Sequence, residues 1–416
     1  APKRIKPDIF PIRIPVAFRD SFGGGEDEDS RLVGFQRPPL VAEQLKAETH
    51  PLLGNTTASL SDSAITWAVN RGKGGRLFQG SRYSVKNSNS DSWRSIQWVL
   101  DDETELGRFE RLEFPSRTRE HIALAASRKT EILQLSPRTL AKGLCLDFTN
   151  TSRHQSVALR GAYYSAAFML QRVMADRLDV DPAEIEVGGI TRVRLGDEPS
   201  AFVGQIMLCD ALVNGSGFVR QLYKELPQVL ESILRPSGNQ DYASSITSPE
   251  HRLREGNRPL CLDACYDCLK GFRNMAYHSL MDWRLAISLL TLMSDASYRA
   301  GADGKFLGPG LDEWVDHAED LLSHFNSDFQ FGGEMTTYGS FMKGLRSDSM
   351  IVVAVHPFWD LTSPTAEVAA CLQAALADAA ASHEFPKVVH YLDTFSLRRR
   401  PGECYQWICD ERYTVG

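Results

Sequence analysis

Three cysteines within eight residues, Cys261, Cys265 and Cys268, constrain this chain more than any other feature. Thiols spaced this closely cannot be independent of one another in the fold. Thiolate and imidazole are the ligands that tetrahedral zinc prefers, and a Cys-x2-Cys pair lets two sulfurs face one ion. His278 follows the cluster. The sequence therefore predicts a Zn2+ site made of Cys261, Cys265, Cys268 and His278, with a remote cysteine as the alternative fourth ligand.

A metal-free explanation of these cysteines is three buried or redox-active thiols. A thioredoxin-type Cys-x-x-Cys pair would open a helix after a strand, whereas a loop precedes this pair. Eight cysteines in 416 residues are too few for a disulfide scaffold. The chain has no apolar run of membrane-spanning length, and its first residues lack the apolar stretch of a signal peptide. We therefore expect a cytoplasmic protein without a membrane partner.

The residue pattern predicts an α/β (α+β) protein of three parts. These are an extended arm and β-rich domain over 1–120, an α/β domain with the zinc knuckle over 121–300, and a small C-terminal α/β tail over 301–416. The hydrophobic periodicity of the middle and tail predicts alternating helices and strands. The expected helices are 152–178, 218–234, 280–293, 312–325 and 366–381, and the expected strands include 202–209, 350–355 and 388–392.

A glycine-rich turn, Asn214, Gly215, Ser216 and Gly217, separates an apolar strand from the helix expected at 218–234. Successive amides of such a turn and the positive end of the helix attract anions, so the turn is a candidate phosphate cradle. The alternative is a tight strand-to-helix connection in which glycine only supplies backbone freedom. Arg220 and Lys224 on the helix favour the phosphate interpretation because they could face the same groove.

The chain carries 46 Lys and Arg against 53 Asp and Glu, a net charge of −7. It therefore has no general attraction for phosphate backbones, and any nucleic-acid contact must be a local patch. Basic groups near aromatic residues are candidates for binding a strand by charge and stacking, although a charge run is also what a solvated face looks like. The candidates are Arg71, Lys73, Arg76, Arg220, Lys224, Arg273, Asn274, Arg398, Arg399 and Arg400.

The cysteine segment also carries a family resemblance. Residues 261–286, with Cys261, Cys265, Cys268, His278 and Asp282-Trp283-Arg284, resemble the zinc-binding domain at the C-terminus of DEAD/DEAH-box helicases of the Mrf DNA-repair type. Further blocks that resemble the same region are 14–20, 159–186, 208–218, 355–360 and 393–401. Together they cover most of residues 10–400. Similar helicases and companion subunits occur in the antiphage defence systems DISARM and Druantia.

The resemblance implies a zinc-binding accessory region that contacts single-stranded or branched DNA and works with a helicase motor and other defence subunits. The chain lacks both the Gly-x4-Gly-Lys-Ser/Thr loop and the Asp-Glu-x-His/Asp box that hold ATP and magnesium. We therefore expect no ATP hydrolysis by this chain alone, the motor being either separated from it or another subunit. Two alternatives stay open: a zinc-dependent hydrolase or nuclease with an open water position, and an interaction scaffold without DNA contact.

Overall fold

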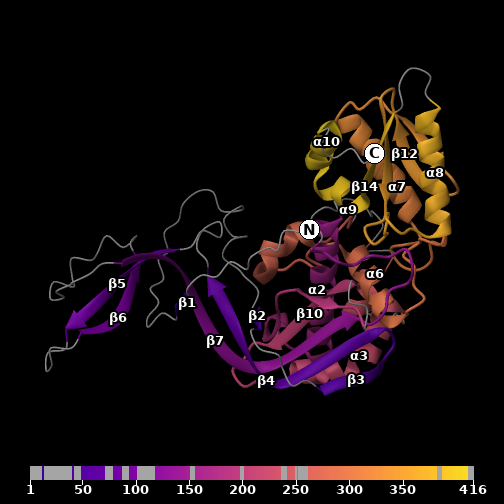
Figure 1. Ribbon diagram of the computed structural model, residues 1–416. Helices are drawn as coiled ribbons and strands as arrows, with labels where there is room; N and C mark the ends of the chain where they lie inside the picture. The colour runs from indigo at the N-terminus through magenta and orange to yellow at the C-terminus, as the bar shows by residue number, and fades with distance from the viewer. Residues whose placement is uncertain are drawn as a thin grey trace. The chain divides into compact units, whose positions relative to one another are not determined.

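A computed structural model describes much of the chain, and it is a mixed α/β protein as predicted (Figure 1). The described residues are 12–13, 40–41, 48–70, 78–86, 93–100, 118–149, 155–196, 201–235, 241–248, 251, 261–381 and 387–410. The chain divides into two compact units, residues 1–44 with 65–129 and residues 45–64 with 130–416. Within the described residues, no helix combines the length and apolar character needed to cross a membrane.

The described part of the first unit consists of strands. They are β1 (Ile12–Arg13), β2 (Leu40–Val41), β5 (Phe78–Lys86), β6 (Trp93–Leu100) and the parts of β4 (Thr56–Asn70) and β7 (Thr118–Pro137) that belong to this unit. β5 pairs with β6 in an antiparallel hairpin and with the beginning of β7 on its other side. The predicted nucleic-acid residues Arg71, Lys73 and Arg76 lie outside the described residues.

The second unit contains a sheet in the order β3-β4-β7-β10-β8, with β9 also paired to β10. Its further strands are β3 (Glu48–Leu53), β8 (Ile185–Val187), β9 (Thr191–Arg194) and β10 (Phe202–Asp210). β10 is antiparallel to β7, and Leu208 lies opposite Leu133. Most of β10 is buried, which explains why its sequence is largely apolar on both faces rather than alternating between apolar and polar residues.

Helix α2 (Ser156–Leu178) is buried on nearly every side and packs against β10 (Figure 1). The close approach depends on Gly204 of β10, whose amide donates to the Tyr163 hydroxyl at 2.7 Å. A Cβ at Gly204 would lie 2.5 Å from the Tyr163 ring, so only glycine fits there. Around α2 lie α3 (Phe218–Leu234), α4 (Tyr242–Ile246), the 3-10 helix η4 (Phe272–Leu280) and α6 (Trp283–Ser294).

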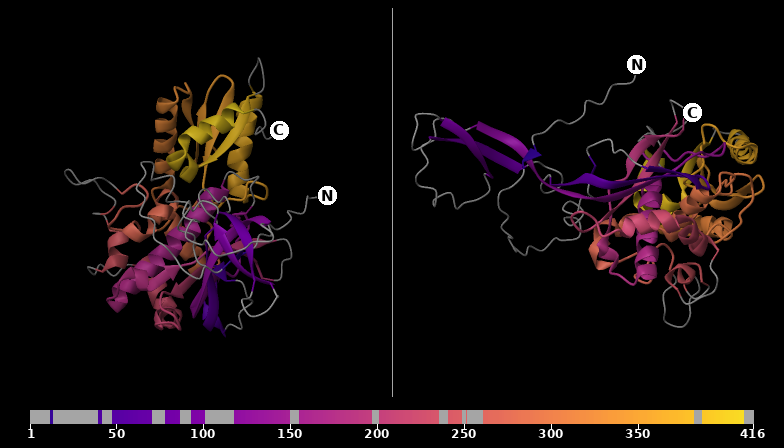
Figure 2. Two further views of the ribbon diagram at one scale, coloured as in Figure 1. Left: turned by 90° about the vertical axis from the view of Figure 1, so that its left-hand side faces the viewer. Right: turned by 90° about the horizontal axis from the view of Figure 1, so that it is seen from below.

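A second sheet in the same unit has the order β11-β12-β13-β14. The strands are β11 (Glu334–Tyr338), β12 (Met342–Arg346), β13 (Met350–Val355) and β14 (Val388–Asp393), and the helices are α7 (Trp314–Asp328), α8 (Ala366–Ala380), α9 (Thr394–Arg399) and α10 (Pro401–Cys409). On β12, Lys343 pairs with Glu319 of α7, whereas Arg346 pairs with Asp378 of α8. Successive side chains of a strand point to opposite faces of the sheet, so Lys343 and Arg346, three residues apart, lie on opposite faces. Helices α7 and α8 therefore cover the two sides of this sheet (Figure 2).

Candidate metal centre

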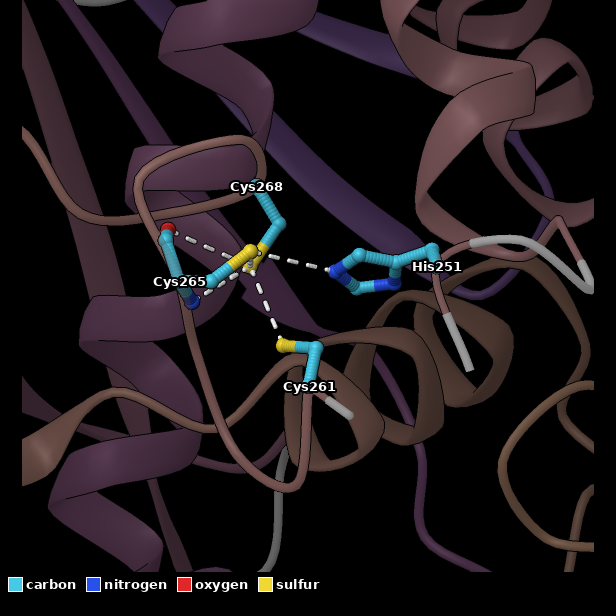
Figure 3. Close-up of side chains that lie close together, drawn as sticks. All are labelled: His251, Cys261, Cys265 and Cys268. Carbon is cyan, nitrogen blue, oxygen red and sulfur yellow. Dashed lines mark hydrogen bonds between the residues drawn. The ribbon is translucent and has the colours of Figure 1, made fainter. Parts of the chain in front are cut away.

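Among the described residues, four side chains converge on one point: His251, Cys261, Cys265 and Cys268 (Figure 3). Their ligand atoms all lie within 4.8 Å of one another. The Cys268 Sγ is 3.8 Å from the Cys261 Sγ and 3.7 Å from the Cys265 Sγ. A tetrahedron with zinc–sulfur bonds of about 2.3 Å places its sulfurs roughly 3.8 Å apart. The donor set and its spacing therefore fit a tetrahedral zinc ion.

His251 presents its Nε2 to the cysteines, at 3.4 Å from the Cys265 Sγ. Its other ring nitrogen, Nδ1, lies 2.6 Å from the carbonyl oxygen of Ile246. A carbonyl only accepts, so Nδ1 carries the proton and the Nε2 lone pair is available to a metal. Metal-binding histidines are commonly oriented in this way by a backbone carbonyl.

The electrostatics of the four groups favour a cation. Hydrogen bonds from Cys261 and Cys268 lower the pKa of the Cys265 thiol, while the same contacts raise the pKa of Cys261. Burial acts to lower the pKa of His251, but its hydrogen bonds and charge interactions with Cys265 and Cys268 outweigh this effect and raise the pKa to about 9. Without metal, a proton on the imidazole therefore supplies the positive charge that the thiolates attract. A bound zinc ion takes over that role and displaces the proton.

Residues 261–270, which carry the three ligand cysteines, are here called the ligand loop. Side chains from other elements donate hydrogen bonds to its backbone carbonyl groups. Arg172 of α2 donates through Nη1 to the carbonyls of Tyr266 at 3.1 Å, Cys268 at 2.6 Å and Lys270 at 3.4 Å. The Tyr242 hydroxyl also donates to the Cys268 carbonyl, and the Arg172 guanidinium lies 4.7 Å from the centre of the Tyr242 ring. These bonds satisfy backbone carbonyls of the loop and hold it against α2 and α4.

His278, the fourth ligand expected from the sequence, does not belong to this group. Its Nε2 lies 3.1 Å from the Gly271 carbonyl and 3.0 Å from the Asn274 Oδ1. The structure places His251 at the centre instead, a residue from the segment before Cys261 that the sequence pattern did not single out. The histidine expected to bind metal therefore supports the turn that follows the ligand loop.

The basic residues predicted to contact DNA at the tail are bound within the protein. Asp263, between two of the ligand cysteines, accepts from the Arg398 Nε at 2.9 Å and pairs with the Arg399 Nη1 at 3.1 Å. Arg399 also donates to the Met281 carbonyl at 2.5 Å, and Arg400 pairs with Glu403 at 2.8 Å. Arg398 and Arg399 therefore attach the ligand loop to α9.

The remaining nucleic-acid candidates differ in exposure. Arg220 is paired with Glu131 at 2.9 Å and with Asp62, whereas Lys224 is exposed one turn further along α3. The Arg273 side chain is 73% exposed, and its nearest acid is Asp181 at 3.8 Å. Asn274 is buried: it accepts from the Gly271 amide and donates to the Leu269 carbonyl. Arg273 and Lys224 are thus accessible, and Asn274 holds the turn.

The glycine turn at 214–217 uses its amides internally. The amides of Ser216 and Gly217 each donate to the Asp210 Oδ2 at 2.6 Å, and the Val219 amide donates to the Asp210 Oδ1 at 3.0 Å. Asp210 is fully buried. Its carboxylate occupies the position that a phosphate would need at this helix N-terminus. The turn is therefore a strand-to-helix connection, and Gly215 and Gly217 adopt the positive φ that it requires.

Comparison with known proteins gives one structural similarity to report. No family model matches the chain, and no curated protein matches its sequence. The fold search finds the DUF1998 helicase MrfA bound to DNA, at 11% identity and a TM-score of 0.30, covering 62% of this chain. The matched region spans 25% of that helicase.

Proposed function

We propose that this chain is a zinc-stabilised, DNA-associated region that serves an ATP-dependent DEAD/DEAH-box helicase, on the same polypeptide or as a companion subunit. The observation that carries the proposal is the convergence of a complete Cys3His ligand set. Its three cysteines lie in the segment whose sequence resembles the Mrf-type zinc-binding domain, and His251 precedes that segment. The ATP-binding motifs are missing from the sequence, so the motor activity belongs to another part of the assembly.

The zinc has a structural role in this proposal. Catalytic zinc sites use three protein ligands and keep one position for water, whereas structural sites use four. Here three sulfurs and one imidazole nitrogen supply four, and Cys261 and Cys268 are only 5% and 1% exposed. Three thiolates also reduce the Lewis acidity of the ion. The hydrolase or nuclease alternative therefore has less support than a site whose binding free energy contributes to folding.

Equilibrium DNA binding tests the proposal and separates it from a scaffold without DNA contact. The zinc-loaded full chain is titrated into fluorescein-labelled single-stranded and forked oligonucleotides, and anisotropy is followed over a series of salt concentrations. A DNA-binding region should lose affinity steeply, with a log–log slope of about −0.7 for each phosphate contacted on a single strand. Absence of salt-sensitive binding to either DNA, with zinc bound, would favour the scaffold and overturn the proposal.

The proposal includes a role in antiphage defence, which rests on the sequence resemblance to helicases of antiphage systems. It is tested in cells that carry the gene for this chain together with its neighbouring genes. Phage plaques should be fewer with the wild-type chain than with Cys265→Ser, which removes one zinc ligand. Equal plaque counts in cells that contain similar amounts of both proteins would remove the defence role and leave the DNA association standing.

A further inference from the structure

Two aromatic side chains beside the metal centre are unusually exposed. Tyr266, between the ligands Cys265 and Cys268, is 65% exposed, and Phe272, at the start of η4, is 84% exposed. Exposed aliphatic and aromatic groups are common singly. Here, however, hydrogen bonds from Arg172, Asn274 and His278 hold the backbone carbonyls and amide next to the two rings. Their exposure is therefore a feature of the site that needs an explanation.

Side-chain hydrogen bonds hold the turn between the rings. Arg172 holds the carbonyls of Tyr266 and Lys270. The buried Asn274 side chain accepts from the Gly271 amide at 2.8 Å and donates to the Leu269 carbonyl at 2.9 Å. A turn held in this way loses little conformational entropy when a ligand stacks on it, and this pre-organisation favours binding.

His278 connects the Tyr266 ring to the backbone beside Phe272. Its imidazole makes an edge contact with the Tyr266 ring at 5.7 Å between centroids, and its Nε2 is bonded to the carbonyl of Gly271, the neighbour of Phe272. The two aromatic rings are therefore displayed on one short support rather than on separate mobile loops.

The charges that accompany the rings are of both signs. Lys270 and Arg273 are positive, and Asp267 and Asp181 are negative. The Arg273–Asp181 pair is long, at 3.8 Å, and its side chains are 73% and 60% exposed, so it is weak and Arg273 can turn toward another anion. Burial lowers the pKa of His278, the bond to the Gly271 carbonyl acts to raise it, and the charges of Lys270 and Arg399 lower it further.

We propose that Tyr266, Lys270, Phe272 and Arg273, here called the aromatic turn, form a stacking platform for single-stranded nucleic acid. Bases would stack on the two rings, and the adjacent phosphates would approach Lys270 and Arg273. Two charged residues, Asp267 and Lys270, lie between the rings in the chain, and the apolar residues Cys268 and Leu269 between them are buried. Exposed rings beside charged groups suit separate bases joined by phosphates better than an apolar peptide. This inference rests on the proposed DNA association and names the residues that carry it.

The test compares Phe272→Ala with Leu307→Ala in the zinc-loaded full chain. Leu307 is 74% exposed in a different part of the unit, so its variant is a matched control for loss of an exposed apolar side chain. Stacking of one base is worth about 1–3 kcal/mol, which corresponds to a loss of about 5- to 150-fold in affinity for single-stranded DNA. Phe272→Ala should show such a loss with an unchanged salt slope, and Leu307→Ala should bind as the wild type does.

A second pair of measurements separates stacking from charge. Lys270→Gln should reduce the magnitude of the salt slope by about 0.7 if it contacts one phosphate. An oligonucleotide with 5-iodouracil should cross-link to Tyr266 or Phe272 on irradiation. If the wild type binds DNA and Phe272→Ala binds equally well, the stacking proposal is wrong and the proposed DNA association stands. The two exposed rings would then be assigned to a contact with another protein. If the wild type does not bind DNA, both proposals fail.

Discussion

Asp263 and Arg399 form an ion pair, with 3.1 Å between Oδ2 and Nη1, that joins the ligand loop of the metal centre to helix α9. The side chains are 13% and 17% exposed, and Arg398 adds a second bond to the same carboxylate. Arg284 of α6 donates to the carbonyl of Leu262, the preceding residue, at 2.5 Å. The metal-binding loop and the helix that follows the C-terminal sheet are thus connected by charged side chains.

Asp263→Asn should lower the free energy of unfolding by about 1–3 kcal/mol, because it removes the charge that two partly buried arginines share. The cost stays below that of a fully buried pair because water reaches these side chains. Urea denaturation of the zinc-loaded chain measures the effect. Glu403→Gln is the control, since its pair with Arg400 is exposed and should contribute less than about 0.5 kcal/mol. Equal stability of both variants would contradict the coupling.

The choice between His251 and His278 as zinc ligand gives a second prediction. His251→Ala should reduce zinc content and thermal stability together, because it removes one of four ligands. His278→Ala should keep zinc, with a smaller loss of stability from the missing bonds to Gly271 and Asn274. Plasma mass spectrometry of purified protein, with Cys265→Ser as the zinc-free reference, measures both. Zinc lost from His278→Ala and retained by His251→Ala would overturn the assignment.

Much of the fold could be predicted because its local patterns are strong. The helix expected at 218–234 is α3 with the same bounds, and the apolar run at 202–209 is the buried strand β10. In the C-terminal sheet, the strand at 350–355 and the helix after it were also predicted. The helices bury one continuous face and the strands are buried on both sides. A helical spacing of apolar residues and a short apolar run are the sequence patterns that these two kinds of burial produce.

The fourth ligand could not be predicted from spacing alone. His251 precedes Cys261 by as many residues as His278 follows Cys268, so the two histidines are equivalent in the sequence. The structure distinguishes them by what holds each ring: the Ile246 carbonyl orients His251 toward the sulfurs, and the Asn274 side chain holds His278. Such partners come from the fold and leave no local signal.

The partners of the basic residues near the C-terminus could not be predicted for a related reason. Arg398 and Arg399 beside Phe395 have the composition of a nucleic-acid patch, but Asp263 lies more than a hundred residues earlier in the chain. The glycine turn at 214–217 was likewise ambiguous, since the same amides suit a phosphate or an internal carboxylate. Only the position of Asp210 at the end of β10 decides between them.

Asp210→Asn should lower the free energy of unfolding by about 2–3 kcal/mol, because the amide has a single accepting oxygen. That oxygen cannot serve Ser216 and Gly217 on one side and the Val219 amide on the other, and the new NH2 group then faces a backbone N–H. Inorganic phosphate should not raise the melting temperature of the wild type. Asp303→Asn, at a surface turn where the carboxylate accepts one amide, is the control and should change stability by less than about 0.5 kcal/mol. Specific stabilisation by phosphate that depends on residues 214–217 would restore the phosphate cradle.

Asp393 gives a pH-dependent prediction. It is fully buried at the end of β14, and burial raises its pKa from 3.8 to about 6 despite the bonds from the Ser396 amide and hydroxyl. A pKa that is higher in the folded state favours the protonated form there. Its stabilising contribution is therefore complete below about pH 4 and is lost as the pH rises through about 6. At neutral pH the charged carboxylate costs up to about 3 kcal/mol relative to acid.

Asp393→Asn removes this titration while keeping an oxygen that can accept from the Ser396 amide. The stability of the variant relative to the wild type should therefore increase by about 1–3 kcal/mol between pH 4 and pH 6 and stay constant above about pH 7. Urea denaturation of both proteins across this range measures the difference, in which the titrations that the two proteins share cancel. A difference that does not change with pH would show that the carboxyl is ionised in the folded protein throughout, with Ser396 compensating for its burial.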